Sequence, residues 1–153
     1  MTTVLGFFHV GITVRSMEQA LPFYRDALGL EIQFTRTLAS PEHRALVGLP
    51  FTEVRVVFLE LPGGGSVELL EYVGLERHSA AARPCDPGSG HLAVYVEDIE
   101  ATVKAGIESG GSLRGDILEL TGGPLAGMRV CYLVDPDGFP IELFQRPAAA
   151  QVS

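Results

Sequence analysis

The feature that most constrains the fold of this chain is an internal repeat. At an offset of 82 positions, HVGITVRSMEQAL (residues 9–21) aligns with HLAVYVEDIEATV (residues 91–103). At an offset of 74, residues 55–72 align with residues 129–146. Seven of these 18 positions are identical: Arg55/Arg129, Val56/Val130, Leu59/Leu133, Pro62/Pro136, Gly64/Gly138, Glu68/Glu142 and Leu69/Leu143. A chain that carries one pattern twice is expected to fold as two copies of one structural unit.

Each copy predicts a strand, a helix and three further strands, which is an α+β pattern. The first strands are expected over residues 7–14 and 90–96, and the helices over about 17–28 and 99–109. Pro22 either kinks the first helix or marks a later start, because proline removes a backbone donor. The segments LPGGG and DPDG are turn signals between the last two strands of each copy.

The chain is long enough for one ordinary domain, with modules over about residues 5–72 and 90–146. Residues 73–89 have the Pro- and Gly-containing composition of a linker. The offset falls by 82 − 74 = 8, so the first copy carries about eight extra residues, which we place in the loop-like stretch 37–52. That insertion is expected to form part of a lid or a plain surface excursion.

Composition excludes several classes of protein. Lys and Arg number 11 against 19 Asp and Glu, a net charge of −8, and the basic residues are scattered, so we expect no nucleic-acid partner. No apolar run approaches the ~18 residues that cross a membrane, and the start has no signal-peptide pattern. Two cysteines, Cys85 and Cys131, make no disulfide framework. The composition favours a cytoplasmic protein.

The repeat singles out two histidines and two carboxylates. His9 is equivalent to His91, and Glu68 is equivalent to Glu142. Side chains alternate between the faces of a strand, and by this alternation each of the four lies on the face opposite its apolar neighbours. We therefore expect all four to line one concave surface.

Two imidazoles and two carboxylates suit a divalent metal ion. Their total charge of −2 neutralises the ion, and the donor set favours Zn, Ni, Co, Mn or Fe over Ca. On a six-coordinate ion they would leave two positions for water or substrate. A single strand histidine is more often a hydrogen-bonded filler, and a single glutamate is more often solvated. The equivalence of both residue types across the repeat favours the metal site.

The segments FHVGITV, LPFYRDALGL, SVELLEY, GHLAVYV and LVDPDGFPIELFQ resemble the vicinal oxygen chelate superfamily. This superfamily includes glyoxalase I, methylmalonyl-CoA epimerase, extradiol dioxygenases and bleomycin-binding proteins. The resemblance spans residues 7–146 and implies two βαβββ modules paired around a concave metal site. It also implies a homodimer and one divalent ion per site, held by His9, Glu68, His91 and Glu142. The two modules that complete a site belong either to one chain or to two.

The resemblance implies a lyase or isomerase of the glyoxalase I or methylmalonyl-CoA epimerase type. Such an enzyme moves a proton α to a metal-bound carbonyl of a small carbonyl compound or thioester, through an enediolate or enolate. We assign Glu142 as the base on one face of the substrate and Glu68 as its counterpart on the other. Substrate and metal identity stay open.

Two other functions are weighed against this one. A non-catalytic antibiotic-binding protein of the bleomycin-resistance type generally lacks the four ligands. An Fe(II) ring-cleaving dioxygenase would use His9, His91 and Glu142, and residues 132–142 match its Y-x2-D-P-x-G-x3-E signature. Its further catalytic histidine is missing here. We expect Tyr132 to be a core aromatic, paired with the equivalent Phe58.

The remaining polar residues receive weaker assignments. Arg36, Arg44 and Arg55 are the nearest candidates to bind an anionic substrate and are otherwise solvated surface arginines. Glu71 is excluded as a ligand because it alternates to the face opposite Glu68. His43 lies in the inserted segment, which is expected to be part of a lid or a plain surface excursion. His78 and Cys85 lie in the linker and are expected to have no chemical role.

Overall fold

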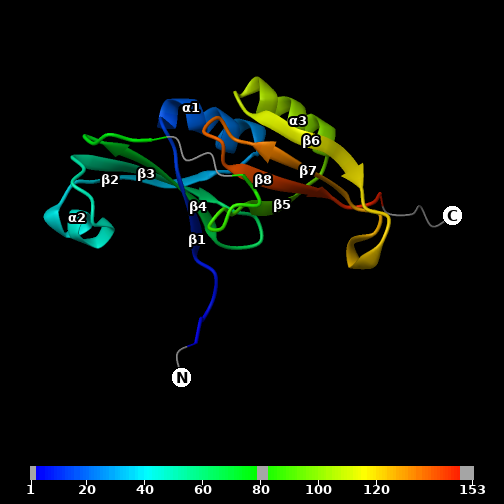
Figure 1. The fold of residues 1–153 in the computed structure, drawn as a ribbon, viewed down its shortest axis with the longest axis horizontal. Coiled ribbons are helices and arrows are strands. Elements are labelled where there is room, and N and C mark those ends of the chain that lie inside the picture. Colours follow the sequence, from blue (N-terminus) through cyan, green and yellow to red (C-terminus); the bar gives the residue numbers. More distant parts are fainter. Residues whose placement is uncertain (1–2, 79–82, 149–153) are drawn as a thin grey trace. The chain divides into compact units, whose positions relative to one another are not determined.

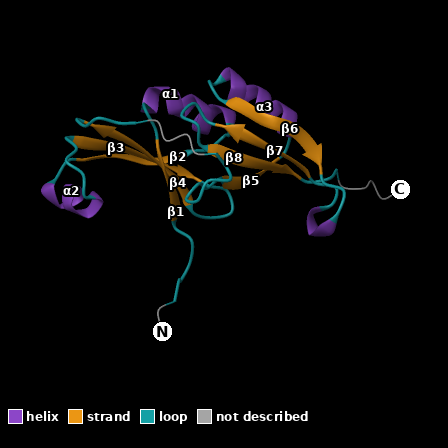
Figure 2. Cartoon of the chain, in the orientation of Figure 1, coloured by secondary structure: helices purple, strands orange, loops and turns teal. Residues whose placement is uncertain are grey.

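The structure is a computed structural model that describes residues 3–78 and 83–148 of the chain. The chain divides into two compact units, Met1–Ser79 and Ala80–Ser153, which we call unit 1 and unit 2. Each unit contains one four-stranded sheet and its own helices (Figures 1 and 2). The predicted α+β fold built from two βαβββ patterns is therefore confirmed.

Unit 1 has the strand order β1-β4-β3-β2. Strand β1 runs parallel to β4, and the other neighbours are antiparallel. Its elements are β1 (His9–Thr13), α1 (Met17–Leu21), a π-helix (Pro22–Ala27), β2 (Ile32–Leu38), α2 (Pro41–Val47), β3 (Glu53–Glu60) and β4 (Ser66–Val73).

Unit 2 repeats this topology with the strand order β5-β8-β7-β6, and β5 runs parallel to β8. Figure 1 shows α3 lying along one face of this sheet. The elements are β5 (Leu92–Val96), α3 (Ile99–Glu108), β6 (Ser112–Glu119), a short 3₁₀ turn (Gly123–Leu125), β7 (Arg129–Val134) and β8 (Pro140–Gln145).

Pro22 changes the winding of the first helix and leaves its start at Met17. The α-helix passes directly into the π-helix, whose last turn closes with the Leu28 N–H donating to the Phe23 carbonyl at 3.0 Å. Proline has no N–H to continue the i−4 ladder, and a wider turn accommodates that loss. In unit 2 the equivalent helix is regular, and its Asp98 cap accepts from the Ala101 N–H at 2.9 Å.

The sequence predicted that the inserted stretch 37–52 is loop-like. This prediction is wrong in part, because the stretch contains helix α2. Pro41 occupies the first turn of α2, and Gly48 ends it in the left-handed conformation at φ 74°. Proline at the start and glycine at the end are a recognised helix signature, so the sequence carried this signal. Arg44 fastens the segment by donating from Nε to the Phe51 carbonyl at 2.8 Å.

Both faces of the unit 1 sheet bury apolar side chains. Helix α1 lies on the face of Glu71, which also carries the fully buried Leu59 and Leu69. The opposite face, on which Glu68 lies, also holds a buried cluster. Phe51, which comes from the insertion, packs on this face. The cluster consists of Phe51, Val54, Val56 and Phe58, with Leu38, Leu70, Tyr72 and Leu75 packed around it.

Candidate functional site: two His–Glu pairs

Unit 1 brings His9 and Glu68 together at the junction of β1 and β4. The parallel register sets Gly11 beside Glu68, so His9, two residues earlier, shares its face. His9 Nε2 lies 3.1 Å from Glu68 Oε2, and the two side chains are 30% and 17% exposed. The ring of Phe58, opposite Glu68 on β3, meets the imidazole edge-to-face at 5.4 Å between centroids.

Unit 2 repeats this arrangement with His91 and Glu142. Ala93 on β5 pairs with Glu142 on β8, and His91 Nε2 lies 3.1 Å from Glu142 Oε2. These side chains are 44% and 18% exposed. Tyr132, opposite Glu142 on β7, meets the His91 ring edge-to-face at 5.4 Å. Each sequence repeat therefore produces the same local pair.

The geometry of each pair fits two ligands of one metal ion. Ligands that bind a single ion at about 2.0–2.2 Å lie about 3 Å apart, which is close to the observed spacing. The pairs are also partly open to solvent, and among the described residues the buried Nδ1 of His9 has no hydrogen-bond partner. The donor set therefore fits a divalent cation, although an ordinary His–carboxylate hydrogen bond has the same length.

Each pair supplies two donors. In residues 3–78 and 83–148 the structure contains no group of three or more His, Cys, Asp or Glu side chains placed to hold a metal ion. A four-ligand site would have to combine a pair from unit 1 with a pair from unit 2. The joint use of His9, Glu68, His91 and Glu142 as ligands stays a prediction.

Tyr132 borders the second pair, so the view of it as a simple core aromatic is wrong. Burial, a hydrogen bond to Glu142 and the negative charge of that carboxylate all raise the pKa of the Tyr132 phenol. The equivalent Phe58 is 8% exposed and has no hydroxyl. Cross-strand pairing with Glu142 is the signal that could have placed Tyr132 on this face.

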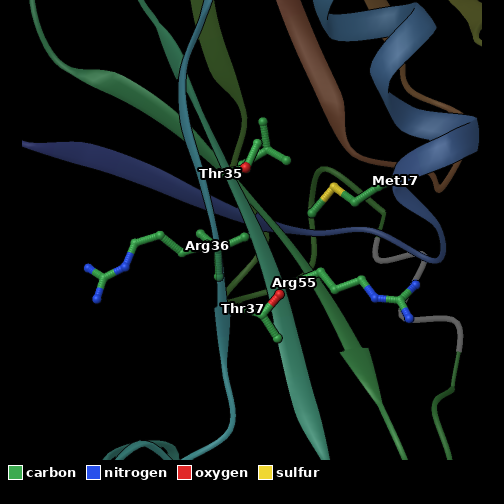
Figure 3. Close-up of a pocket in the computed structure, with 7 residues that line it drawn as sticks. Met17, Thr35, Arg36, Thr37 and Arg55 are labelled. Atoms are coloured by element: carbon green, nitrogen blue, oxygen red, sulfur yellow. The ribbon is translucent and has the colours of Figure 1, made fainter.

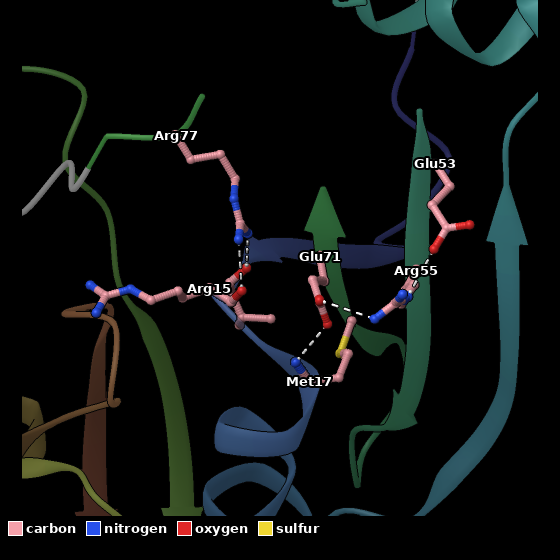
Figure 4. Close-up of polar contacts among 7 residues, drawn as sticks. Arg15, Met17, Glu53, Arg55, Glu71 and Arg77 are labelled. Atoms are coloured by element: carbon pink, nitrogen blue, oxygen red, sulfur yellow. Dashed lines mark hydrogen bonds and ion pairs between the residues drawn. The ribbon is translucent and has the colours of Figure 1, made fainter. Parts of the chain in front are cut away.

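Glu71 serves the fold rather than the site, as its position on the opposite face predicted. Its carboxylate accepts from the Met17 N–H at 2.9 Å, which caps the start of α1, and from Arg55 at 3.3 Å (Figure 4). Arg55 also binds Glu53, and Arg77 donates to the backbone carbonyls of Val14 and Arg15. Arg55, one of the arginines predicted to bind an anionic substrate, is therefore already paired with two carboxylates of the protein.

A shallow pocket in unit 1 lies away from the His–Glu pair. It is formed by the start of α1 and strands β2 and β3, and Figure 3 shows Arg36 and Arg55 extending to opposite sides of these strands. Its lining contains neither a histidine nor a carboxylate: Met17, Thr35, Arg36, Thr37, Arg55, Val56 and Val57.

The other polar residues named from the sequence are not members of either His–Glu pair. His43 Nδ1 contacts the Ser40 hydroxyl at 2.8 Å at the start of α2. His78 and Cys85 are exposed in the segment between β4 and β5. The turn that begins at Asp135 is structural, as predicted, since its carboxylate accepts from the N–H groups of Asp137 and Phe139.

Comparison with known proteins places the chain in a family. Residues 8–132 match the family model of the glyoxalase/bleomycin resistance protein/dioxygenase superfamily. The chain belongs to this superfamily. A glyoxalase family protein from Bacillus cereus has the same fold as this superfamily member, with a TM-score of 0.81 at 22% identity. That match covers 96% of this chain and 97% of the other.

Two curated relatives of this superfamily member are named enzymes. A 2-epi-5-epi-valiolone epimerase from Actinomyces sp is 31% identical over 93% of this chain and 80% of its own length. A lactoylglutathione lyase from Haemophilus influenzae is 26% identical over 92% and 93%. The two relatives are thus named as an epimerase and a lyase. None of the described helices is long and apolar enough to span a membrane.

Proposed function

We propose that this protein is a divalent-metal-dependent enzyme that moves a proton on the carbon next to a substrate carbonyl. The observation that carries the proposal is the pair of equivalent His–Glu contacts, both at 3.1 Å. Epimerisation is the first reaction to test, because an epimerase is the relative with 31% identity. The lactoylglutathione lyase reaction is the second, favoured by the several relatives of that name. Both need the same proton transfer.

The metal would be held by His9 and Glu68 from unit 1 together with His91 and Glu142 from unit 2. A bound divalent ion would supply Lewis-acid polarisation of the substrate carbonyl, which makes the neighbouring C–H more acidic. Aromatic rings contact both imidazoles edge-to-face at 5.4 Å between centroids, which would help to orient them as ligands. Zn, Ni, Co, Mn and Fe all suit this donor set.

The two carboxylates would divide the proton transfer between them. Glu142 is assigned as the base on one face of the substrate, and Glu68 is its counterpart on the other. Removal of a proton by one carboxylate and its return by the other inverts the carbon, whereas return by the same carboxylate does not. Two equivalent glutamates therefore suit an epimerase.

Assembly of the four ligands would follow from pairing of the two units. We propose modules over about residues 5–72 and 90–146 joined by the linker 73–89, with the site completed within one chain or in a homodimer. Cys85 and Cys131 are both free thiols, which suits the reducing cytoplasm. The partner of the enzyme would be a small carbonyl compound or thioester.

Metal content is the first test. Chelator-treated protein is reloaded with Zn, Ni, Co or Mn, and bound metal is measured for wild type, Glu68→Gln, His91→Ala and the control Glu71→Gln. The control alters the same strand on the opposite face and keeps an acceptor for the Met17 N–H. We expect about one ion per site in wild type and control, and loss in both site variants. Metal that survives without Glu68 would favour the three-ligand dioxygenase instead.

Proton exchange is the second test. Metal-loaded enzyme in D2O is incubated separately with hydroxyketones, acyl-CoA epimers and the hemithioacetal of methylglyoxal with glutathione, and NMR follows deuterium at the α carbon. We expect exchange with one class, reduced at least 100-fold in Glu142→Gln. Absence of both metal and exchange, with tight binding of a cationic antibiotic, would replace the enzyme by a binding protein.

A further inference from the structure

The His91–Glu142 pair lies at one end of a row of side chains that crosses the whole unit 2 sheet. Ala93 pairs with Glu142, Glu142 with Tyr132, and Tyr132 with Arg114 on β6. Directly paired residues on neighbouring strands share one face of a sheet. Arg114 therefore lies on the face of Glu142, two strands and about 10 Å away along the row.

Arg114 has no ion pair with a carboxylate among the described residues, and part of its guanidinium is buried. Its Nη1 is buried and has no hydrogen-bond partner among the described residues. Arg83 and Arg129, by contrast, form ion pairs with Asp86 and Glu100. A buried guanidinium donor without an acceptor is costly, so its retention requires an explanation.

The equivalent row in unit 1 has no such residue. It consists of Gly11, Glu68, Phe58 and Phe34 in the same cross-strand order. Phe34 holds the row position in unit 1 that Arg114 holds in unit 2. It stacks on Phe58, with 4.6 Å between the ring centroids. The cation is thus specific to unit 2, and the repeated fold does not require it.

We infer that Arg114 forms a binding subsite for an anionic group, a carboxylate or a phosphate, on the His91–Glu142 face. The planar guanidinium fork matches both groups, and an anion would supply the acceptor that Nη1 lacks. The inference rests on the proposed function in one respect, that the anion belongs to the substrate of the proton transfer. Held there, the anion would fix which face of the reacting carbon meets Glu142.

The test measures anion binding directly and needs no metal or turnover. Metal-free full-length protein in a cationic buffer is titrated with inorganic phosphate and, separately, with acetate, while chloride keeps the ionic strength constant. NMR follows the Arg114 Nε–H signal and the Gly115 and Tyr132 amides. The variants are Arg114→Met, Arg114→Lys and the control Arg83→Met, which removes one exposed charge from the same unit.

We expect saturable shifts at Arg114 in wild type and Arg83→Met, with binding at least tenfold weaker in Arg114→Met and intermediate in Arg114→Lys. Stronger binding of phosphate would indicate a phosphorylated substrate, and stronger binding of acetate a carboxylic acid. Shifts that do not saturate, or that persist in Arg114→Met, would overturn the subsite.

The metal content of Arg114→Met separates the two proposals. It should equal that of wild type, because Arg114 is no ligand. Anion binding in a protein that takes up no metal would refute the proposed function and support the subsite. Metal uptake without anion binding would refute the subsite and leave the proposed function in place.

Discussion

The two units carry the same His–Glu pair at one end of a four-strand row and opposite chemistry at the other. In unit 1 the row continues into Phe58 and Phe34, which stack on each other. In unit 2 it continues into Tyr132, which binds Glu142, and Arg114. The difference shows that the repeat keeps the geometry of the pair while its surroundings are free to become apolar or polar.

The helices on the opposite faces of the two sheets also differ. In unit 2 the helix approaches its sheet closely at Gly106, where a Cβ would lie 2.6 Å from Leu133 Cδ2. At the equivalent helix position unit 1 carries Tyr24, fully buried within the π-helix. One topology therefore accepts a glycine or a tyrosine at this helix position.

The largest effect is expected from truncating the equivalent core residues Leu59 and Leu133, both fully buried. Leu59→Ala and Leu133→Ala should each lower the free energy of unfolding by about 2–5 kcal/mol, since each leaves a cavity. Chemical denaturation measures both, with the exposed Leu118→Ala as the control. A loss confined to one variant would show that the two cores are not equivalent in energy.

Helix α2, in the inserted stretch of unit 1, gives the next effect. Arg44→Met removes hydrogen bonds to the carbonyls of Phe51 and Thr52 and should destabilise the protein by about 1–3 kcal/mol. Hydrogen exchange should speed up over residues 41–52. Arg36→Met, an exposed arginine in the neighbouring strand, serves as the control. Unchanged exchange in Arg44→Met would mean that the insertion is held by its apolar contacts alone.

Substitution of the aromatic residue opposite each glutamate tests the polar difference between the two rows. Tyr132→Phe should cost about 1–2 kcal/mol, since it removes the hydrogen bond to Glu142. The pKa of Tyr132 is raised in the folded state. The phenol therefore contributes fully to the free energy of unfolding below the ordinary phenol pKa near 10, and this contribution is lost as the pH rises through the pKa of the folded state.

Absorbance of the phenolate during alkaline titration tests that pKa. The titration of Tyr132 should disappear in Tyr132→Phe and move to lower pH in Glu142→Gln, which removes the negative charge. Identical alkaline titrations of wild type and Glu142→Gln would refute the contact. Phe58→Tyr is the reciprocal variant and should introduce a new high-pKa phenol beside Glu68.

The smallest effect is expected at Cys131, which stands where unit 1 has Val57. Cys131→Val should change stability by less than about 1 kcal/mol, because the volumes are similar. Burial raises the pKa of the Cys131 thiol to about 11, whereas Cys85 is exposed. A thiol reagent at pH 8 should therefore label one cysteine per native chain rapidly and both after denaturation. Rapid labelling of both native thiols would contradict the burial of Cys131.

Much of the site could be read from strand alternation. The period of two along a strand places His9 and His91 away from the apolar face, and the repeat pairs each with a glutamate. The same alternation placed Glu71 on the helix side, where it caps α1. Tyr132 was misjudged because its match to Phe58 was read as burial, although its hydroxyl finds Glu142 across the strand.

Helix α2 was missed for a different reason. Its Pro41 and Gly48 punctuation was visible, but a seven-residue helix carries too short an apolar pattern to stand out from a loop. Its anchoring depends on the contact between Arg44 and the backbone of Phe51, which no local pattern predicts.

The sequence by itself determined the two α+β units, their order of elements and the two equivalent His–Glu pairs, because the repeat and strand alternation are local properties. The tertiary structure decided that Phe34 and Arg114 end the two rows. Their strands, β2 and β6, fall outside the aligned repeats, and each contains a register shift. An irregularity of one residue moves side chains to the other face of a sheet, so only the actual pairing of strands reveals which residue faces the site.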